Sequence, residues 1–261
     1  MNPRISVIMG VYNDEKNVGR AIKSILNQTY RNFEFIIIND GSTDKTQEVI
    51  GSFDDERIIN VINKKNMKFT WCLNYGLDIA RGEFIATQDS DDISMPTRLE
   101  EEIKVFENSS PNVALVASFC RKIRDSGEIV SLAAPTEFDL IKKKLIIKNL
   151  FHHNCLYKKT VVINLGKYKK NYLYAQDYDL WFRLIREGYE FRITPKELLL
   201  INKSRSEERR QTYEMIKTRL VALYYLDYPF YYSIYLIRPL IDLLLPNFIK
   251  RPIQHHILRS R

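Results

Sequence analysis

The sequence predicts an α/β protein with a mostly parallel central sheet and helices on both faces of that sheet. Two observations favour this class. Short apolar runs alternate with amphipathic helical segments along the first part of the chain, which is the order that parallel sheets with helical connections require. Polar clusters directly follow three of those runs, at the strand ends where such sheets bind ligands. With 261 residues, 45% of them apolar and 28% charged, the chain can form one large or two small domains.

In the first half of the chain, the pattern of apolar residues separates strands from helices. Strands are expected over the apolar runs 5–9, 33–38, 58–62 and 83–87. Helices are expected where apolar residues recur every three or four positions, over 18–26, 44–50 and 70–80. Because the carboxyl ends of parallel strands meet at one edge, this order brings Tyr12, Asp40 and Asp89 to the same edge of the sheet.

The second half of the chain carries weaker signals. An amphipathic helix is expected over 97–108, a strand over 113–119, and a hairpin turn over 124–128 that leads into a strand at 129–130. A helical stretch near 140–146 carries three lysines, 142–144, on a face that we expect to be solvated. A short strand is expected over 155–157, and a further helix begins near Gln176.

Three carboxylates fall within four residues directly after the strand expected at 83–87. Asp89, Asp91 and Asp92 repel one another unless a cation lies between them. Hard cations such as Mg²⁺ or Mn²⁺ prefer carboxylate oxygens and keep only one or two protein ligands where phosphate is also bound. The spacing therefore suits a metal–diphosphate site. The alternative is a solvated acidic loop or the start of the helix that follows Met95.

Three blocks of the sequence are distinctive: ISVIMGVYNDEKNVGRAIKSILNQTYRNFEFIIINDGSTDKT, then NYGLDIARGEFIATQDSDD, then YAQDYDLWFRL. In this order and spacing, over residues 5–184, they resemble the inverting family 2 glycosyltransferases of GT-A fold, whose DxD motif matches the second block. The resemblance implies a Rossmann-like GT-A domain that acts in the assembly of bacterial surface polysaccharide or lipopolysaccharide. No glycine-rich GxGxxG or Walker loop competes for the nucleotide.

The resemblance assigns nucleotide binding to Gly10, Tyr12, Asp40 and Asp89. Tyr12 matches the aromatic residue that packs on the base, Asp40 the carboxylate that accepts the imide N–H of the base, and Asp89 the residue near the ribose. Uracil and thymine have this N–H and cytosine lacks it, so the acceptor favours a UDP- or dTDP-linked sugar, and UDP is expected. Without the other blocks, Tyr12 would be a surface aromatic and Asp40 a turn residue before Gly41.

The metal site follows from the same comparison. Asp91 matches the metal ligand, so the expected cofactor is Mn²⁺ or Mg²⁺, and Asp92 is expected to orient the ligand. Between the blocks the chain departs from the family pattern, with Lys68 where the family usually has Gly and Leu73 where it usually has Arg. The missing Arg removes a contact expected near the diphosphate. Lys68 is either a replacement cation or an ordinary solvated lysine.

Asp177 matches the catalytic aspartate of the family, at the beginning of a helix. Inversion by single displacement needs a carboxylate that takes the proton from the acceptor hydroxyl as it attacks. Capping of the helix is the alternative role. Asp179 is expected to be a supporting hydrogen-bond partner. His152 fits a position where relatives often carry a histidine near the acceptor or diphosphate, and a structural histidine is the alternative.

The last 46 residues differ in composition from the rest of the chain. They carry seven Lys and Arg against two Asp, which is +5 of the formal +8, and seven aromatic residues lie within 224–235. The longest charge-free apolar run, 228–237, is half of the ~20 residues needed to span a bilayer. We expect helices that lie in an anionic membrane surface. Docking of this tail on the catalytic domain or on a second subunit is the alternative.

These assignments predict a domain over 1–215, with a nucleotide-sugar half over about 1–108 and an acceptor half over 109–215, followed by the tail over 216–261. The expected activity is metal-assisted, inverting transfer of one sugar from a nucleotide-diphosphate donor to a hydroxyl of a membrane-bound glycolipid or polysaccharide. The absence of the Gln-x-x-Arg-Trp motif of polymerising relatives favours one sugar per encounter. The alternative is a catalytically silent binding or scaffold protein of the same fold at the membrane surface.

The N-terminal sequence, the cysteines and the distribution of charge bear on cellular location and on nucleic-acid binding. No apolar signal-peptide core follows Met1, and three cysteines without CxxC spacing fit a reducing compartment. We therefore expect a cytoplasmic protein attached to the inner face of the cell membrane. The pI of 9.2 does not indicate nucleic acid, because the positive charge is concentrated in the tail and no nucleic-acid-binding motif is present.

Overall fold

The computed structural model describes residues 2–123, 127–145, 150, 154–172, 175–202, 216, 218–220 and 222–223. Three of the predicted features lie outside these residues: the tip of the hairpin turn at 124–126, His152, and the tail from 224 to 261. Within the described ranges, no helix is long and apolar enough to cross a membrane.

The described residues form one nine-stranded sheet in the order β3-β2-β1-β4-β8-β6-β9-β5, with β7 paired to β6. The strands are β1 (Ile5–Val11), β2 (Phe33–Asn39), β3 (Ile58–Ile62), β4 (Phe84–Thr87), β5 (Ile93–Ser94), β6 (Val113–Ile123), β7 (Ile129–Leu132), β8 (Leu156–Lys158) and β9 (Glu190–Asn202). The helices are α1 (Val18–Leu26), α2 (Thr46–Gly51), α3 (Phe69–Ile79), α4 (Arg98–Glu107), α5 (Phe138–Leu145), α6 (Lys159–Asn164) and α7 (Gln176–Arg186).

The first half of the sheet is parallel, as the sequence predicts. β1 pairs in parallel with β2 on one side and with β4 on the other, and β3 pairs in parallel with β2. Every residue of β1 and β2 is buried, which is typical of parallel strands covered on both faces. The predicted helices between these strands are present, with bounds shifted by at most two residues.

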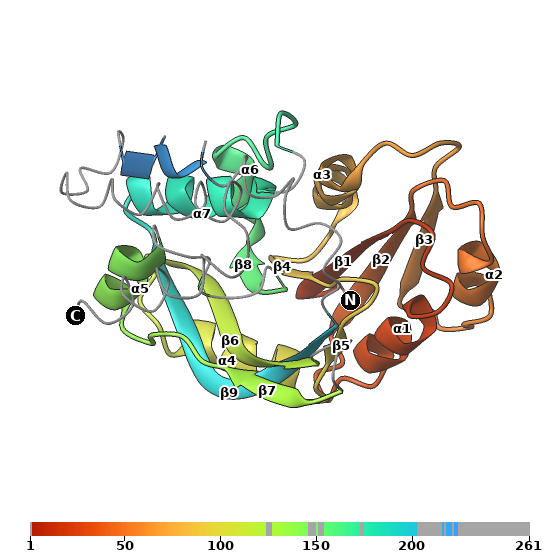
Figure 1. Ribbon diagram of the computed structural model, residues 1–261, viewed down its shortest axis with the longest axis horizontal. Helices are drawn as coiled ribbons and strands as arrows, with labels where there is room; N and C mark the ends of the chain where they lie inside the picture. The colour runs from red at the N-terminus through yellow and green to blue at the C-terminus, as the bar shows by residue number, and fades with distance from the viewer. Residues whose placement is uncertain are drawn as a thin grey trace, which may run out of the picture.

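The prediction of a mostly parallel sheet is wrong for the second half. β8 is antiparallel to both β4 and β6, β5 is antiparallel to β9, and β6 forms a hairpin with β7. Only the β6–β9 pair is parallel there, and its register shifts near Ser118 and Phe119. Such irregularities bend long strands, and Figure 1 shows β6 and β9 curving beneath α7.

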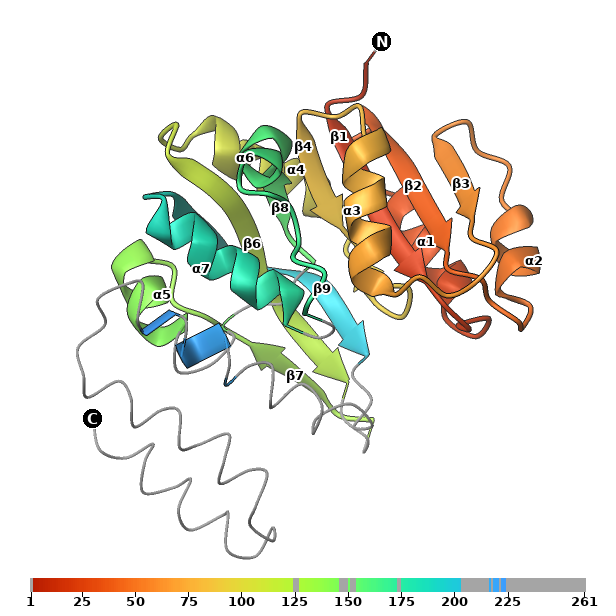
Figure 2. The same ribbon diagram turned by 90° about the horizontal axis from the view of Figure 1, so that it is seen from above.

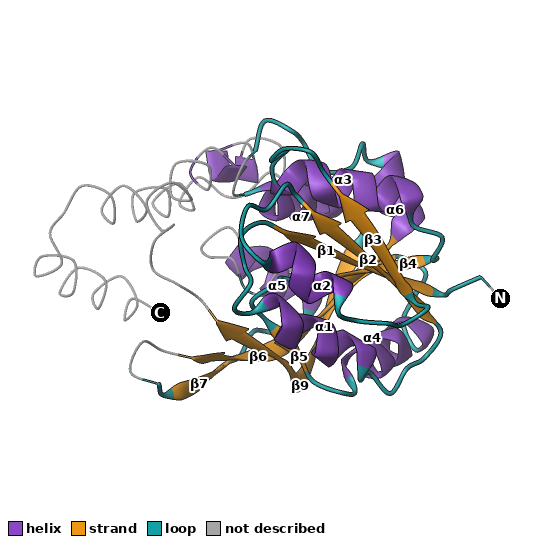
Figure 3. Ribbon diagram, turned by 90° about the vertical axis from the view of Figure 1, so that its right-hand side faces the viewer, coloured by secondary structure: helices purple, strands orange, loops and turns teal. Residues whose placement is uncertain are grey.

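Helices cover both faces of the sheet, as expected. In Figure 2, α3, α6 and α7 lie in front of the strands, and Figure 3 shows α1 and α4 on the opposite face. A hydrophobic cluster fills each interface. The first cluster joins one face of the sheet to α3, α5, α6 and α7, and the second joins the other face to α1, α2 and α4. Because the sheet is packed on both faces, the positions at which β1, β2 and β4 end are held in place.

Candidate functional site

The acidic turn, residues 89–92, directly follows β4 and brings the three predicted carboxylates together. Asp89, Asp91 and Asp92 each offer an oxygen, and these oxygens lie within 4.8 Å of one another. Asp89 and Asp91 are partly buried and Asp92 is buried. A compact set of carboxylate oxygens is the donor set that Mg²⁺ and Mn²⁺ prefer. The residues therefore fit the predicted cation.

Asp92 fastens the acidic turn to two distant segments. One of its oxygens accepts a hydrogen bond from Asn154 Nδ2 at 2.8 Å, and the other accepts one from the backbone N–H of Asn202 at 3.0 Å. Asn154 stands just before β8, and Asn202 is the last residue of β9. The carboxylate of Asp92 therefore orients the turn, which leaves Asp89 and Asp91 as the less buried carboxylates of the turn.

Tyr12 lies in the loop after β1, and its side chain is available to a ligand. The residue is 47% exposed, unlike most large apolar residues of this half. The loop is fixed to the loop after β2 by Asn13, whose backbone N–H donates to Ser42 Oγ at 3.0 Å and whose Oδ1 accepts from the backbone N–H of Thr43 at 2.8 Å. An exposed ring on a fixed loop suits stacking on a planar base.

Asp40 is buried just beyond β2 and already has three hydrogen-bond donors. Its Oδ1 accepts from Asn63 Nδ2 and from the backbone N–H of Met67, and its Oδ2 accepts from the backbone N–H of Lys68, all at 2.8 Å. A carboxylate has about four acceptor positions. Asp40 thus fastens the loop that leads into α3.

Gly10 has a packing reason that does not involve a nucleotide. A Cβ built on Gly10 would lie 3.0 Å from Cys72 Cβ and 3.2 Å from the Phe69 ring, so glycine allows α3 to pack closely on β1. Burial and the neighbouring Asp40 carboxylate raise the pKa of the Cys72 thiol, which keeps it protonated. Gly10 therefore serves the packing of α3 on β1.

The two departures from the family pattern have different structural settings. Leu73 is 2% exposed and belongs to the hydrophobic cluster beneath α3. Lys68, at the N-cap of α3, has φ 80° and ψ 151°, a conformation that only glycine adopts without strain. Its side chain is exposed. The chain thus keeps a strained lysine at the position where the resemblance leads one to expect glycine.

Asp177 is the second residue of α7 and is 8% exposed. The N-cap is Ala175, which makes no side-chain cap hydrogen bond, so Asp177 does not occupy the capping position. Its charge reaches Cys155: the pKa of the Cys155 thiol is raised mainly by burial, with smaller contributions from Glu102 and Asp177. Cys155 directly follows Asn154, whose side chain donates to Asp92.

Asp179 is held in an ion pair on the same helix. Arg183 Nε lies 2.8 Å from Asp179 Oδ2, and Lys169 Nζ lies 3.8 Å from Oδ1. The Arg183 guanidinium also donates to the backbone carbonyl oxygens of Leu165 and Lys167. Asp179 therefore joins α7 to the loop before it.

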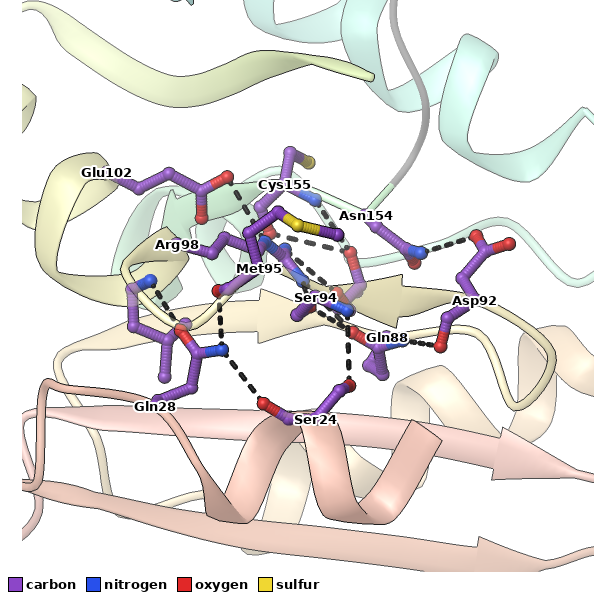
Figure 4. A network of polar contacts seen from close by, with 12 residues as sticks. Ser24, Gln28, Gln88, Asp92, Ser94, Met95, Arg98, Glu102, Asn154 and Cys155 are labelled. Carbon is purple, nitrogen blue, oxygen red and sulfur yellow. Dashed lines mark hydrogen bonds and ion pairs between the residues drawn. The ribbon is translucent and has the colours of Figure 1, made fainter. Parts of the chain in front are cut away.

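A buried polar network beneath the acidic turn was not predicted. Arg98 and Glu102 on α4 are completely buried and form an ion pair with Nε–Oε1 3.2 Å. Figure 4 shows this pair on the side of Gln88 and Ser94 that is away from Asp92. Burial raises the pKa of Glu102 to about 7, although the Arg98 charge opposes that shift. In the sequence, only Gln88 pointed to this network, because it is a polar residue directly after an apolar strand.

Comparison with known proteins confirms the resemblance. Residues 6–166 match the family model described as Glycosyl transferase family 2. An uncharacterized glycosyltransferase of Methanocaldococcus jannaschii is 34% identical over 229 residues, which are 85% of this chain and 78% of that protein. The O-antigen biosynthesis glycosyltransferase WbnJ of Escherichia coli is 33% identical over 186 residues, which are 70% of this chain and 72% of that protein.

Solved structures are similar in fold. Residues 1–349 of S. aureus TarS, in complex with UDP, match with a TM-score of 0.69 and 18% identity over 99% of this chain and 75% of that one. The mannosyltransferase PcManGT from Pyrobaculum calidifontis, in complex with GDP-Man and Mn²⁺, matches with a TM-score of 0.66 and 18% identity over 85% of this chain and 65% of that one. At such identities the likeness concerns the fold alone, and it confirms the predicted α/β GT-A-like architecture.

Proposed function

This chain belongs to glycosyl transferase family 2, and we propose that it moves one sugar, with inversion, from a nucleotide-diphosphate donor to a hydroxyl of a glycolipid or polysaccharide. The observation that carries the proposal is the acidic turn, whose three carboxylate oxygens gather within 4.8 Å at the strand ends where this fold binds ligands. The O-antigen relative supports a polysaccharide product.

The donor is proposed to be a UDP-sugar. The exposed ring of Tyr12 would stack on the base, and the Asp40 carboxylate would accept the imide N–H of uracil. The TarS complex with UDP supports this class of donor, and the PcManGT complex with GDP-Man supports a nucleotide sugar more generally.

Asp91 would hold the divalent cation within the cluster of carboxylate oxygens, Asp89 would lie near the ribose, and Asp92, which accepts hydrogen bonds from Asn154 and Asn202, would orient the turn. A cation bound there supplies positive charge to the departing diphosphate. Asp177 is the proposed general base that takes the proton from the acceptor hydroxyl. Its place on α7, outside the capping position, supports that role.

Most residues on the acceptor side of the proposal lie outside the part of the chain that the structure describes. At the start of the tail, Arg219 and Ala222 are buried, and Arg219 Nε donates a hydrogen bond to Tyr178 Oη of α7 at 3.4 Å. The basic and aromatic tail over 216–261 would lie on an anionic membrane surface, where a lipid-linked acceptor is found. His152 would lie near the acceptor or the diphosphate. The full chain should then sediment with anionic liposomes at low salt and be released at high salt, because screening weakens attraction between basic residues and lipid.

A donor screen tests the activity. Purified full-length protein is incubated with a panel of nucleotide sugars and a membrane lipid extract, and nucleoside diphosphate release is followed with Mn²⁺, with Mg²⁺ and with a chelator. We expect release from a UDP-sugar that needs both the metal and the extract. If the protein binds a nucleotide sugar but releases no diphosphate under any condition, the chain is instead a binding protein of this fold, a reading that the buried Leu73 favours.

A further inference from the structure

The side chain of Gln88 closes the acidic turn from the interior of the protein. Its Nε2 donates hydrogen bonds to two backbone carbonyl oxygens, those of Asp89 and Asp92, each at 2.9 Å. Gln88 is 1% exposed, and Figure 4 shows its amide pointing at the turn. A single amide group thus bonds the first and the last residue of the acidic turn.

Two side chains fix the orientation of that amide. Gln88 Oε1 accepts hydrogen bonds from Ser94 Oγ at 2.6 Å and from Arg98 Nη1 at 3.2 Å. The same guanidinium donates to Ser94 Oγ at 2.9 Å and to the backbone carbonyl of Thr87 at 3.0 Å. Because Oε1 is engaged by two donors, the Nε2 group must face the carbonyls of the turn.

The network is not explained by stability alone. Arg98 and Glu102 are both removed from water, and Glu102 Oε2 has no hydrogen-bond partner among the described residues. Replacing a buried ion pair by apolar residues of similar volume is often neutral, or stabilising by about 1–4 kcal/mol. Because this ion pair lies beside a turn of three carboxylates, we infer that it is kept for the conformation of that turn.

The relevant feature of the turn is the short distance between its carboxylates. Oxygens of Asp89, Asp91 and Asp92 lie within 4.8 Å of one another, and like charges at that range repel. A bond across the two ends of the turn opposes the relaxation that would separate them. Groups that orient ligating carboxylates in this way change metal affinity by about 10–100-fold.

We propose that Gln88 is a positioning residue for the cation site, which holds the acidic turn closed before a cation binds, and that Ser94 and Arg98 hold Gln88. This inference rests on the cation site of the proposed function.

Gln28 is a matched control within the same network. It is 0% exposed, its Nε2 donates to the backbone carbonyls of Ser24 at 2.9 Å and Met95 at 2.8 Å, and its Oε1 accepts from the backbone N–H of Leu99 at 3.0 Å. It joins α1 to the start of α4 and makes none of its hydrogen bonds to residues 89–92. Gln28→Met and Gln88→Met each remove two donated hydrogen bonds from a buried site.

The test is Mn²⁺ binding to the full chain, measured from free Mn²⁺ by electron paramagnetic resonance, alongside thermal unfolding. We expect both variants to lose similar stability. Gln88→Met should raise the Kd for Mn²⁺ about tenfold or more, while Gln28→Met should leave it within about twofold of the wild type. Equal Kd values for Gln88→Met and wild type would overturn the proposal, and so would equal weakening in both variants.

Gln88→Glu keeps the test decisive if Gln88→Met does not fold. Glutamate retains an oxygen for Ser94 and Arg98 but turns its second oxygen toward two carbonyls, so the bond across the turn is lost. Weaker Mn²⁺ binding supports the proposal, and wild-type binding contradicts it. If the wild type itself does not bind Mn²⁺, the cation site of the proposed function fails and this inference with it. If the wild type binds and the Gln88 variants bind equally, the inference alone fails.

Discussion

The two halves of the sheet hold their proposed reactive carboxylates in different ways. In the parallel half, the acidic turn continues β4 directly and is bonded by Gln88, Asn154 and Asn202. In the mixed half, Asp177 depends on where α7 packs, for example through the edge-on contact of Trp181 with Phe191 of β9 at 6.2 Å between ring centres. The proposed donor side is therefore held by hydrogen bonds around one turn, two of them from segments distant in sequence. The helix of the proposed base is placed by hydrophobic packing on β9 together with the hydrogen bonds of Arg183.

Asp91→Ala should have the largest effect of any change in the parallel half. Removing the proposed ligand leaves the diphosphate without its cation, a loss of several kcal/mol in the transition state and a fall in turnover of about 10³-fold or more. Mn²⁺ binding should be lost as well, with thermal stability unchanged or higher because one repelling carboxylate is gone. Exposed Asp54→Ala is the control. Full activity of Asp91→Ala would refute the cation site.

Asp177→Asn makes the corresponding change in the mixed half. The substitution is nearly isosteric and removes the proton acceptor, so we expect turnover to fall by about 10²–10⁴-fold while donor binding persists. Asp179→Asn, two residues along α7, weakens the ion pair with Arg183 and should lower thermal stability with little change in the rate per folded molecule. If Asp177→Asn instead lowers only thermal stability while Asp179→Asn lowers turnover, Asp177 has a structural role and is not the general base.

The same division explains which elements could be predicted. In the parallel half each strand and helix carries its own periodic pattern, so β1 to β4 and α1 to α3 were predicted within two residues. β9 was missed although Leu198 to Ile201 form a short apolar run, because Pro195, Lys196 and Glu197 interrupt the strand pattern before that run. Its pairing with β6 joins segments far apart in the chain. The two-residue β5 is too short for a periodic signal, and α6 was not recognised in the sequence.

The candidate site divides in a similar way. The acidic turn and Asp177 were candidates because reactive carboxylates at a strand end and a helix start are visible in the sequence. Arg98 and Glu102 were not, since an i,i+4 pair of opposite charges on an amphipathic helix normally marks a solvated face. Their burial is decided by β4, β5 and the residues before β8, which no local pattern encodes.

The pH dependence of stability tests the parallel half of this comparison, because Glu102 pairs with Arg98, which holds Gln88 against the acidic turn. Burial raises its pKa to about 7 from the ordinary 4.5, so the folded state keeps a proton that the unfolded state releases. Stability should therefore fall as pH rises from about 4.5 to 7, by up to about 3 kcal/mol from this group, and level off above. Glu102→Gln cannot titrate there.

We expect Glu102→Gln to gain stability relative to the wild type as pH rises from 5 to 8, measured by urea unfolding across that range. The neutral amide still accepts a hydrogen bond from Arg98 Nε, so the comparison isolates the proton. A stability difference that stays constant with pH would show that Glu102 does not titrate in this window.

The smallest expected effect comes from the strained lysine at the start of α3. Lys68 holds φ 80° and ψ 151°, which costs about 1–3 kcal/mol for a residue with a Cβ. Glycine relieves that strain and loses part of the gain to the greater freedom of the unfolded chain. Lys68→Gly should therefore raise stability by about 1 kcal/mol and Tm by about 2–4 °C. The backbone N–H that binds Asp40 remains in the variant.

Lys65→Gly, in the same loop, is the matched control, because Lys65 is exposed and is not among the residues with positive φ. It gains no relief from strain and should lower stability slightly through the same unfolded-state entropy. The KM for the donor, measured in both variants, then tests whether the strained Lys68 has a role in donor binding. If Lys68 supplies a cation to the diphosphate, Lys68→Gly is more stable yet raises the KM for the donor severalfold, while Lys65→Gly leaves KM unchanged. A more stable Lys68→Gly with unchanged kinetics would make this lysine an ordinary solvated side chain in a strained position.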